Sequence, residues 1–114
     1  MQQLRNVVVT GSNKGIGFAL AEKLAARGGW HVIMAVRNPA LGEESRGKIL
    51  QQFPQAQVSL EQLDISDSKS IDAFVPRIKD KYHHVDVLIN NAGVAAKGDA
   101  FDSDVFNMTF NTVR

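Results

Sequence analysis

The chain has 114 residues, of which 44% are hydrophobic, so it can bury one core and forms at most one domain, residues 1–114. Thirteen basic and twelve acidic residues leave a net charge of +1, which gives no case for nucleic-acid or membrane binding. The sequence contains no cysteine, which excludes disulfides and thiolate zinc sites and is typical of a cytoplasmic protein.

The first predicted element is a buried strand at 6–10, followed by a glycine-rich turn. Three valines at 7–9 form an apolar run, as in a strand that is buried on both faces. Gly11, Gly15 and Gly17 follow, and residues without a Cβ can turn sharply and let a ligand approach the backbone. The helix that begins here presents unpaired N–H groups and a partial positive charge. Together these features predict a site for a pyrophosphate.

The first helix is expected at 15–27, with Ile16, Leu20 and Leu24 on its buried side because they fall four residues apart. Two glycines at 28–29 are expected to end it in a left-handed conformation.

A second strand is expected at 31–36 and a second helix at 39–52. Asn38 is a good N-cap, and proline is tolerated at the first helical position. The apolar face of this helix is sparse and consists of Leu41, Ile49, Leu50 and Phe53.

A third strand is expected at 57–63, where apolar and polar residues alternate as they do near the edge of a sheet. A third helix at 68–82 follows the i, i+3, i+4, i+7 pattern, with Ser66 or Asp67 as its N-cap. Pro76 lies within it and predicts a bend or a separate first turn.

A fourth strand is expected at 85–90, a loop at 94–101, and a last helix from residue 102 or 103 onward. Strands that alternate with helices predict an α/β fold, with a parallel sheet and right-handed crossovers. The predicted topology is βαβαβαβα with strand order 3-2-1-4, the first half of a Rossmann-type doubly wound sheet. Strand four would then be an exposed apolar edge, open to self-association.

The glycine spacing is informative because it differs from the common G-x-G-x-x-G fingerprint. The segment TGSNKGIG at 10–17 has three residues between its first two glycines and resembles the short-chain dehydrogenase/reductase family, in particular its carbonyl-reductase-type members. The segment NNAG at 90–93 matches a second motif of that family at the expected distance. Extended, sugar-modifying members favour two residues between the first glycines, so they fit less well.

The resemblance implies an NADP(H) site. The glycines at 11, 15 and 17 and the N–H of Ile16 would line the pyrophosphate, with Ser12, Asn13 and Lys14 forming the loop between them. Lys14 would attract a phosphate, although a solvated turn residue is an equally good interpretation. No metal site is predicted: the sequence has no Cys, and the histidine pair at 83–84 is more typical of a surface loop.

Arg37 follows the second strand at the position where an NAD-binding chain carries an acid for the ribose 2′-hydroxyl. A guanidinium instead suits the 2′-phosphate of NADP through paired N–H donors. The alternative is an arginine in a polar loop. Some carbonyl-reductase-type relatives carry another basic residue a turn further on, where this chain has Ala40 and Leu41.

The resemblance assigns further roles along the chain. Asp64 would accept from the adenine amino group, with Ile65 packed on the ring. Within NNAG, an asparagine such as Asn90 would brace the strands, while Ala92 and Gly93 would lie against the cofactor ribose. The family's catalytic asparagine, which holds a water in a proton relay, would correspond to Asn111, unless this is an ordinary helical asparagine.

Reduction of a carbonyl needs a proton donor for the developing alkoxide. The family uses Tyr-x-x-x-Lys and an upstream serine for this purpose, but Tyr82 is the sole tyrosine and Asp86 stands four residues later. These groups are expected after Arg114, since the chain covers about half of the family's length.

Three hypotheses about function follow. The first is the cofactor-binding part of an NADPH-dependent carbonyl reductase acting on a small ketone or aldehyde, inactive without its second half. The second is a stand-alone, non-catalytic nucleotide-binding module. The third is a non-catalytic relative that associates through its exposed edge or last helix. The abrupt end of the chain within a predicted helix favours the first.

Overall fold

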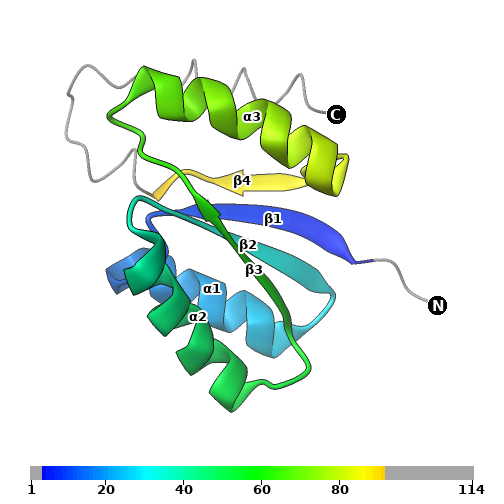
Figure 1. Cartoon of the computed structure of the whole chain (residues 1–114). Helices are drawn as coiled ribbons and strands as arrows, with labels where there is room; N and C mark the ends of the chain where they lie inside the picture. The colour runs from blue at the N-terminus through cyan, green and yellow to red at the C-terminus, as the bar shows by residue number, and fades with distance from the viewer. Residues whose placement is uncertain (1–3, 92–114) are drawn as a thin grey trace.

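The computed structural model describes residues 4–91 of the chain. They form a four-stranded parallel sheet covered by helices on both faces (Figure 1). The elements are β1 (Arg5–Thr10), α1 (Gly15–Arg27), β2 (Trp30–Val36), α2 (Pro39–Gln52), β3 (Gln57–Gln62), α3 (Ser68–Tyr82) and β4 (Val87–Ile89). The strand order is β3-β2-β1-β4, which confirms the predicted α/β class and topology.

The helices begin and end where the sequence predicts, whereas the strands differ slightly at their ends. β2 begins one residue earlier, at Trp30, and β3 ends one residue earlier, at Gln62. β4 has only three residues instead of the six expected at 85–90. The expected loop at 94–101 and the last helix lie outside the described residues.

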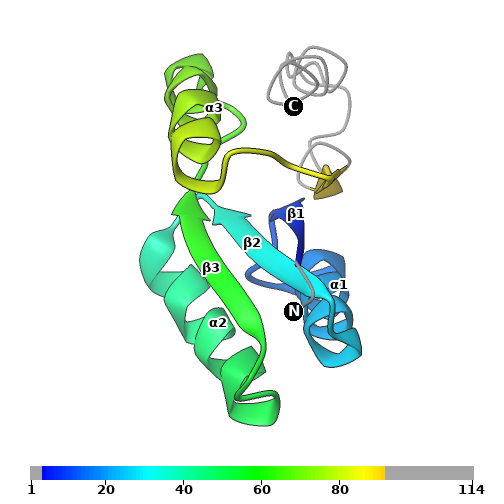
Figure 2. The same ribbon diagram turned by 90° about the vertical axis from the view of Figure 1, so that its right-hand side faces the viewer.

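Two hydrophobic layers hold the helices to the sheet. In Figure 2, α3 lies on one face, and α1 and α2 lie on the other. Alternate residues of the central strands face opposite layers, so Val8 packs with Phe74 and Ile78 of α3, while Val7 packs with the helices on the other face. Both central strands are therefore buried on both sides, as their apolar runs predict.

The predicted buried face of α1 is wrong at Ile16, whose side chain is 72% exposed. The buried positions of α1 are instead Gly17, Ala21 and Ala25. These small residues let the helix lie close to the sheet, and this rotation directs the first-turn isoleucine outward.

One other expectation about the helices is wrong, and a second is wrong in part. Leu41 was expected in the core of α2 but is 51% exposed, and Gly42, Ser45 and Ile49 form the buried face. Pro76 was expected to bend the helix or to separate off its first turn, and the separate turn is excluded because α3 is one helix from Ser68 to Tyr82. Pro76 lies on the exposed side of that helix.

We predict opposite effects for two glycine-to-alanine changes in α2. A Cβ at Gly42 would lie 2.6 Å from Val36 Cγ2 and 2.7 Å from Leu60 Cδ1, so Gly42→Ala should destabilise the fold by about 1–3 kcal/mol. A Cβ at Gly47 meets nothing within 4 Å, so Gly47→Ala should stabilise the fold by about 0.5–1 kcal/mol through helix propensity. Urea unfolding of both variants measures the difference. Equal effects would show that α2 is not tightly packed on the sheet.

Candidate functional site

The carboxyl ends of the parallel strands open onto a cleft of about 590 Å³. Four loops line it: the glycine-rich turn after β1, the β2–α2 junction, the segment after β3, and Asn91 after β4. The lining residues are Thr10, Gly11, Asn13, Lys14, Gly15, Ile16, Arg37, Asn38, Leu41, Leu63, Asp64, Ile65, Ser66 and Asn91. A cleft at this edge and of this size is typical of a small-molecule site in a doubly wound sheet.

The glycine-rich turn has a backbone that other residues rarely adopt. Gly11 and Gly15 have φ angles of 60° and 63°, in the left-handed region that favours glycine. Lys14 is the N-cap of α1, and its side chain makes no hydrogen bond to the first-turn N–H groups. These N–H groups therefore lack a side-chain cap, and together with the helix dipole they favour an anion at the cleft.

Gly17 is needed for a different reason, the close approach of α1 to the turn. A Cβ at this position would lie 2.4 Å from the carbonyl oxygen of Gly11 and 2.8 Å from Nδ2 of Asn91. Asn91 Nδ2 donates to that same carbonyl oxygen over 3.3 Å. The turn is thus held between α1 and the loop after β4.

Asn91 is a residue whose role the sequence analysis missed. The NNAG motif contains it, but the motif alone does not say which asparagine reaches the turn. Asn90 instead lies behind the cleft, where its Oδ1 accepts from Thr10 Oγ1 over 3.2 Å and so ties β1 to the end of β4. Asn90 does not line the cleft, so its role toward the cofactor stays a prediction.

Other predicted site residues do not line the cleft. Ser12 is fully buried, and its Oγ has no hydrogen-bond partner among residues 4–91. Gly17 is buried beneath the turn. Ala92, Gly93 and Asn111 lie outside the described residues, so their roles stay predictions.

Arg37 lies at the end of β2, exposed and lining the cleft. Within residues 4–91, no ion pair occupies its guanidinium. The adjacent Asn38 caps α2, its Oδ1 accepting from the N–H groups of Ala40 at 3.0 Å and Leu41 at 3.4 Å. The β2–α2 junction is therefore locally fixed, while the arginine head group stays open to solvent.

Asp64 faces the cleft from the other side as a carboxylate. Its Oδ1 accepts from the Ser66 hydroxyl over 2.6 Å and from the Ser66 N–H over 3.0 Å. These hydrogen bonds hold the pKa of Asp64 below its ordinary value, and the positive charge of Arg37 adds to the effect. Asp67 caps α3 through a 3.0 Å bond from Lys69 N–H, so Asp64 does not serve as the helix cap.

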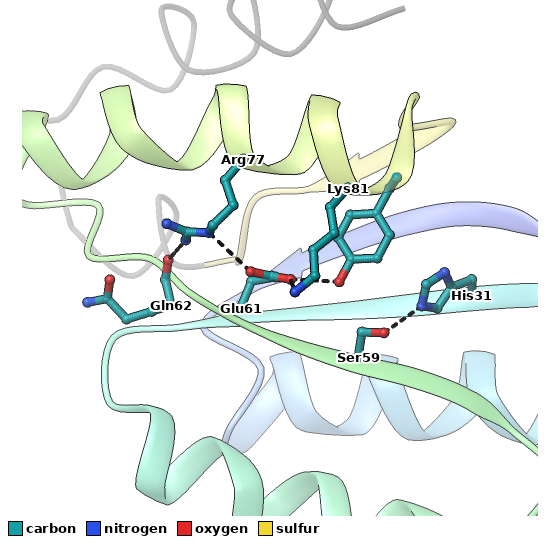
Figure 3. A network of polar contacts seen from close by, with 7 residues as sticks. His31, Ser59, Glu61, Gln62, Arg77 and Lys81 are labelled. Carbon is teal, nitrogen blue, oxygen red and sulfur yellow. Dashed lines mark hydrogen bonds and ion pairs between the residues drawn. The ribbon is translucent and has the colours of Figure 1, made fainter.

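A second polar cluster lies between β3 and α3 (Figure 3), and none of its residues lines the cleft. Glu61, only 5% exposed, accepts from Tyr82 OH at 2.6 Å, Lys81 Nζ at 2.8 Å and Arg77 Nε at 3.2 Å. Arg77 also donates to the carbonyl oxygen of Gln62 over 2.6 Å. The sequence does not reveal this cluster, because a glutamate in a strand of alternating apolar and polar residues is expected to face solvent.

Tyr82 is therefore a structural residue. Burial and its hydrogen bond to Glu61 raise the pKa of Tyr82 to about 12, which opposes any role as a proton donor at neutral pH. His31 is structural too, as predicted: its Nε2 is 2.7 Å from Ser59 Oγ, and its ring meets Tyr82 edge-on. Burial lowers the pKa of His31.

The part of the chain that the structure describes offers neither a metal site nor a membrane-spanning helix. No group of three His, Cys, Asp or Glu residues there could hold a metal ion. None of the helices there has both the length and the apolar character needed to cross a bilayer.

The geometry of the cleft agrees with the comparisons with known proteins. A sequence model of the short chain dehydrogenase family matches residues 5–113. The chain belongs to this family. It is 41% identical over 105 residues to (-)-isopiperitenone reductase from Mentha piperita, covering 90% of this chain and 33% of that protein.

Solved structures of short-chain dehydrogenase relatives give the same result. Menthone neomenthol reductase from Mentha piperita superimposes with a TM-score of 0.72 at 39% identity, over 78% of this chain and 31% of that one. An NADPH-dependent reductase involved in bacilysin biosynthesis also has a TM-score of 0.72, at 32% identity, over 78% of this chain and 37% of that one. The chain thus spans about a third of the length of the relatives it matches.

The ultraviolet titration of the tyrosine tests the Glu61 cluster. Because the sequence has one tyrosine, the phenolate signal reports Tyr82 alone, with a pKa of about 12 when folded and about 10 when unfolded. In Glu61→Gln the folded pKa should fall but stay above its ordinary value, since burial, the larger cause, remains. Glu43→Gln, on the exposed side of α2, is the control and should change nothing. A folded pKa near 10 in the wild-type chain would contradict the contact.

Acid unfolding tests the same cluster from the carboxylate side. Burial raises the pKa of Glu61, but hydrogen bonds from Lys81 and Tyr82 and the charge of Lys81 outweigh it, so the net shift is downward. A lowered folded pKa stabilises the fold above the ordinary value of 4.5, and this contribution is lost as pH falls through the folded pKa. Glu61→Gln should therefore destabilise by about 1–3 kcal/mol at pH 7, and by progressively less below pH 4.5, in urea unfolding. A constant difference across that range would refute the assignment.

Proposed function

We propose that this chain is the cofactor-binding part of an NADPH-dependent reductase that reduces a ketone or aldehyde by hydride transfer. The observation that carries the proposal is the placement of Arg37, with no ion-pair partner among the described residues, in the same cleft as the uncapped N-terminus of α1. The two features are suited to the two phosphate-bearing parts of NADP(H).

The residues fit the cofactor along the length of the cleft. The turn and the first-turn N–H groups would receive the pyrophosphate, and a Cβ at Gly15 would meet nothing within 4 Å, so the backbone there is accessible. The 2′-phosphate would bind Arg37. Asp64 would accept from the adenine amino group, and Ile65 would pack on its ring.

The proposal extends to the family's chemistry. When bound, NADPH supplies the hydride. The relatives named above are reductases, and one is named as NADPH-dependent. Asn111 would hold a water in the proton relay, and Ala92 and Gly93 would lie beside the ribose.

The proton donor is expected from a Tyr-x-x-x-Lys that the 114 residues do not contain, since Tyr82 is followed by Asp86 at the fourth position. The alternative, a nucleotide-binding module without catalysis, is supported no better by the cleft or by the relatives. In either case we propose a cytoplasmic protein that can self-associate through the β4 edge or the segment that follows it.

Reversal of the charge at position 37 tests the cofactor assignment. Arg37→Asp should weaken NADP⁺ binding by about 10- to 100-fold, because a charge-assisted phosphate contact is replaced by repulsion. The affinity for NAD⁺ should stay the same or increase. The matched control is Arg27→Asp, at the exposed end of α1, which should leave both affinities unchanged. Equal loss of NADP⁺ and NAD⁺ binding in Arg37→Asp would argue against the assignment.

Steady-state assays test whether the chain binds the cofactor without catalysing the reduction. The 114-residue chain should bind NADPH and yet fail to oxidise it when ketones and aldehydes are added, because its sequence contains no Tyr-x-x-x-Lys to protonate the alkoxide. Absorbance of NADPH over time measures this. Carbonyl-dependent oxidation above the rate without protein would overturn this part of the proposal.

A further inference from the structure

Ser45 links α2 to the glycine-rich turn. Its hydroxyl donates to the carbonyl oxygen of Asn13 over 2.6 Å, joining residues 32 positions apart. The side chain is 7% exposed, so water competes little for this bond. Asn13 itself lines the cleft, whereas Ser45 lies behind it.

Other contacts fix the position of α2, so Ser45 is not what places the helix. Gly42 lies against Val36 and Leu60 so closely that a Cβ would have no room there. Arg46 Nε donates to the carbonyl oxygen of Val58 over 2.7 Å, tying the helix to β3. Ile49 is fully buried in the layer beneath the sheet. Ser45 therefore donates to the turn from a helix, α2, whose position is determined by other contacts.

The bond sets the orientation of one peptide plane. Because the peptide unit is planar and trans, fixing the carbonyl of Asn13 also fixes the N–H of Lys14, which points the opposite way. Lys14 is the N-cap of α1, and Gly15 beside it holds a φ angle of 63°. A turn with two glycines at positive φ can adopt many conformations, so a hydrogen bond from outside the turn restricts which of them it adopts.

We propose that Ser45 is a positioning residue for the dinucleotide: it holds the glycine-rich turn in the shape that receives the pyrophosphate. The inference rests on the proposed function. It adds a determinant outside the cleft, on α2, whose first turn already borders the site of the 2′-phosphate. One helix therefore supports both phosphate-binding parts of the cleft.

A comparison of two nucleotides distinguishes a positioning role of Ser45 from an effect on the overall stability of the fold. NADP⁺ needs the turn, whereas adenosine 2′-monophosphate carries no phosphate at its 5′ position and needs only the adenine and Arg37 side of the cleft. Both are titrated calorimetrically into the full wild-type chain, Ser45→Ala and Ser45→Cys, which replaces the hydroxyl with a weak donor. The matched control is Ser59→Ala, which loses a 2.7 Å hydrogen bond on the α3 face, away from the cleft.

We expect Ser45→Ala to raise the Kd of NADP⁺ about three- to tenfold while the Kd of adenosine 2′-monophosphate stays within about twofold. Ser45→Cys should show the same selectivity, which keeps the test decisive if the alanine variant does not fold. Ser59→Ala should change neither Kd.

Equal weakening of both nucleotides, or an unchanged Kd for NADP⁺, would overturn the inference and leave the proposed function standing. Failure of the wild-type chain to bind NADP⁺ would instead contradict the proposed function, and the inference with it.

Discussion

The cleft depends on how closely the first turn of α1 approaches the end of β1. With glycine at position 17, the helix comes so near the carbonyl oxygen of Gly11 that a Cβ would lie 2.4 Å from it. The N-terminus of α1 is thereby brought to the carboxyl edge of the sheet, where an anion can reach its N–H groups. Any larger residue at position 17 would push the helix and the turn apart and widen the site that the pyrophosphate is proposed to fill.

The segments that line the cleft are held in place by hydrogen bonds from other elements. Asn91 holds the turn from the β4 side, and Ser45 holds it from α2. The wall after β3 is supported by α3, since Asp64 N–H donates to Ser70 Oγ over 2.9 Å and Arg77 binds the carbonyl oxygen of Gln62. Through Arg77, the buried Glu61 cluster therefore supports the segment after β3, although its own residues do not line the cleft.

Local signals explain what the sequence predicted well. The helix ends were predicted because their determinants lie within a few residues, as with the Asn38 cap and the glycines after α1, whose φ angles are 78° and 84°. The parallel sheet follows from the alternation of strands and helices, and the order 3-2-1-4 is that of the Rossmann-type half. Gly11 and Arg37 were expected at one edge because each follows a predicted parallel strand, and the structure brings them together in one cleft.

Long-range contacts explain what the sequence did not show. Glu61 is buried because its partners come from α3, 16 to 21 residues away. Ile16 and Leu41 were placed in the core because apolar spacing does not tell a buried face from the wall of a cleft, which also carries apolar side chains. The link from Ser45 to the turn crosses 32 residues, and a serine on a helix gives no sign of it.

The most direct test of the account is an amide chemical-shift map of the chain with adenosine 2′,5′-bisphosphate. This ligand carries the adenine, the 2′-phosphate and the first 5′-phosphate. If the cleft binds this ligand, shifts are expected in three segments that meet in space, namely 11–17, 37–41 and 63–66. Amides of α3 from residue 77 onward should serve as the unperturbed reference. An absence of shifts, or shifts confined to the α3 face or the β4 edge, would contradict the assignment of the cleft as the NADP(H) site.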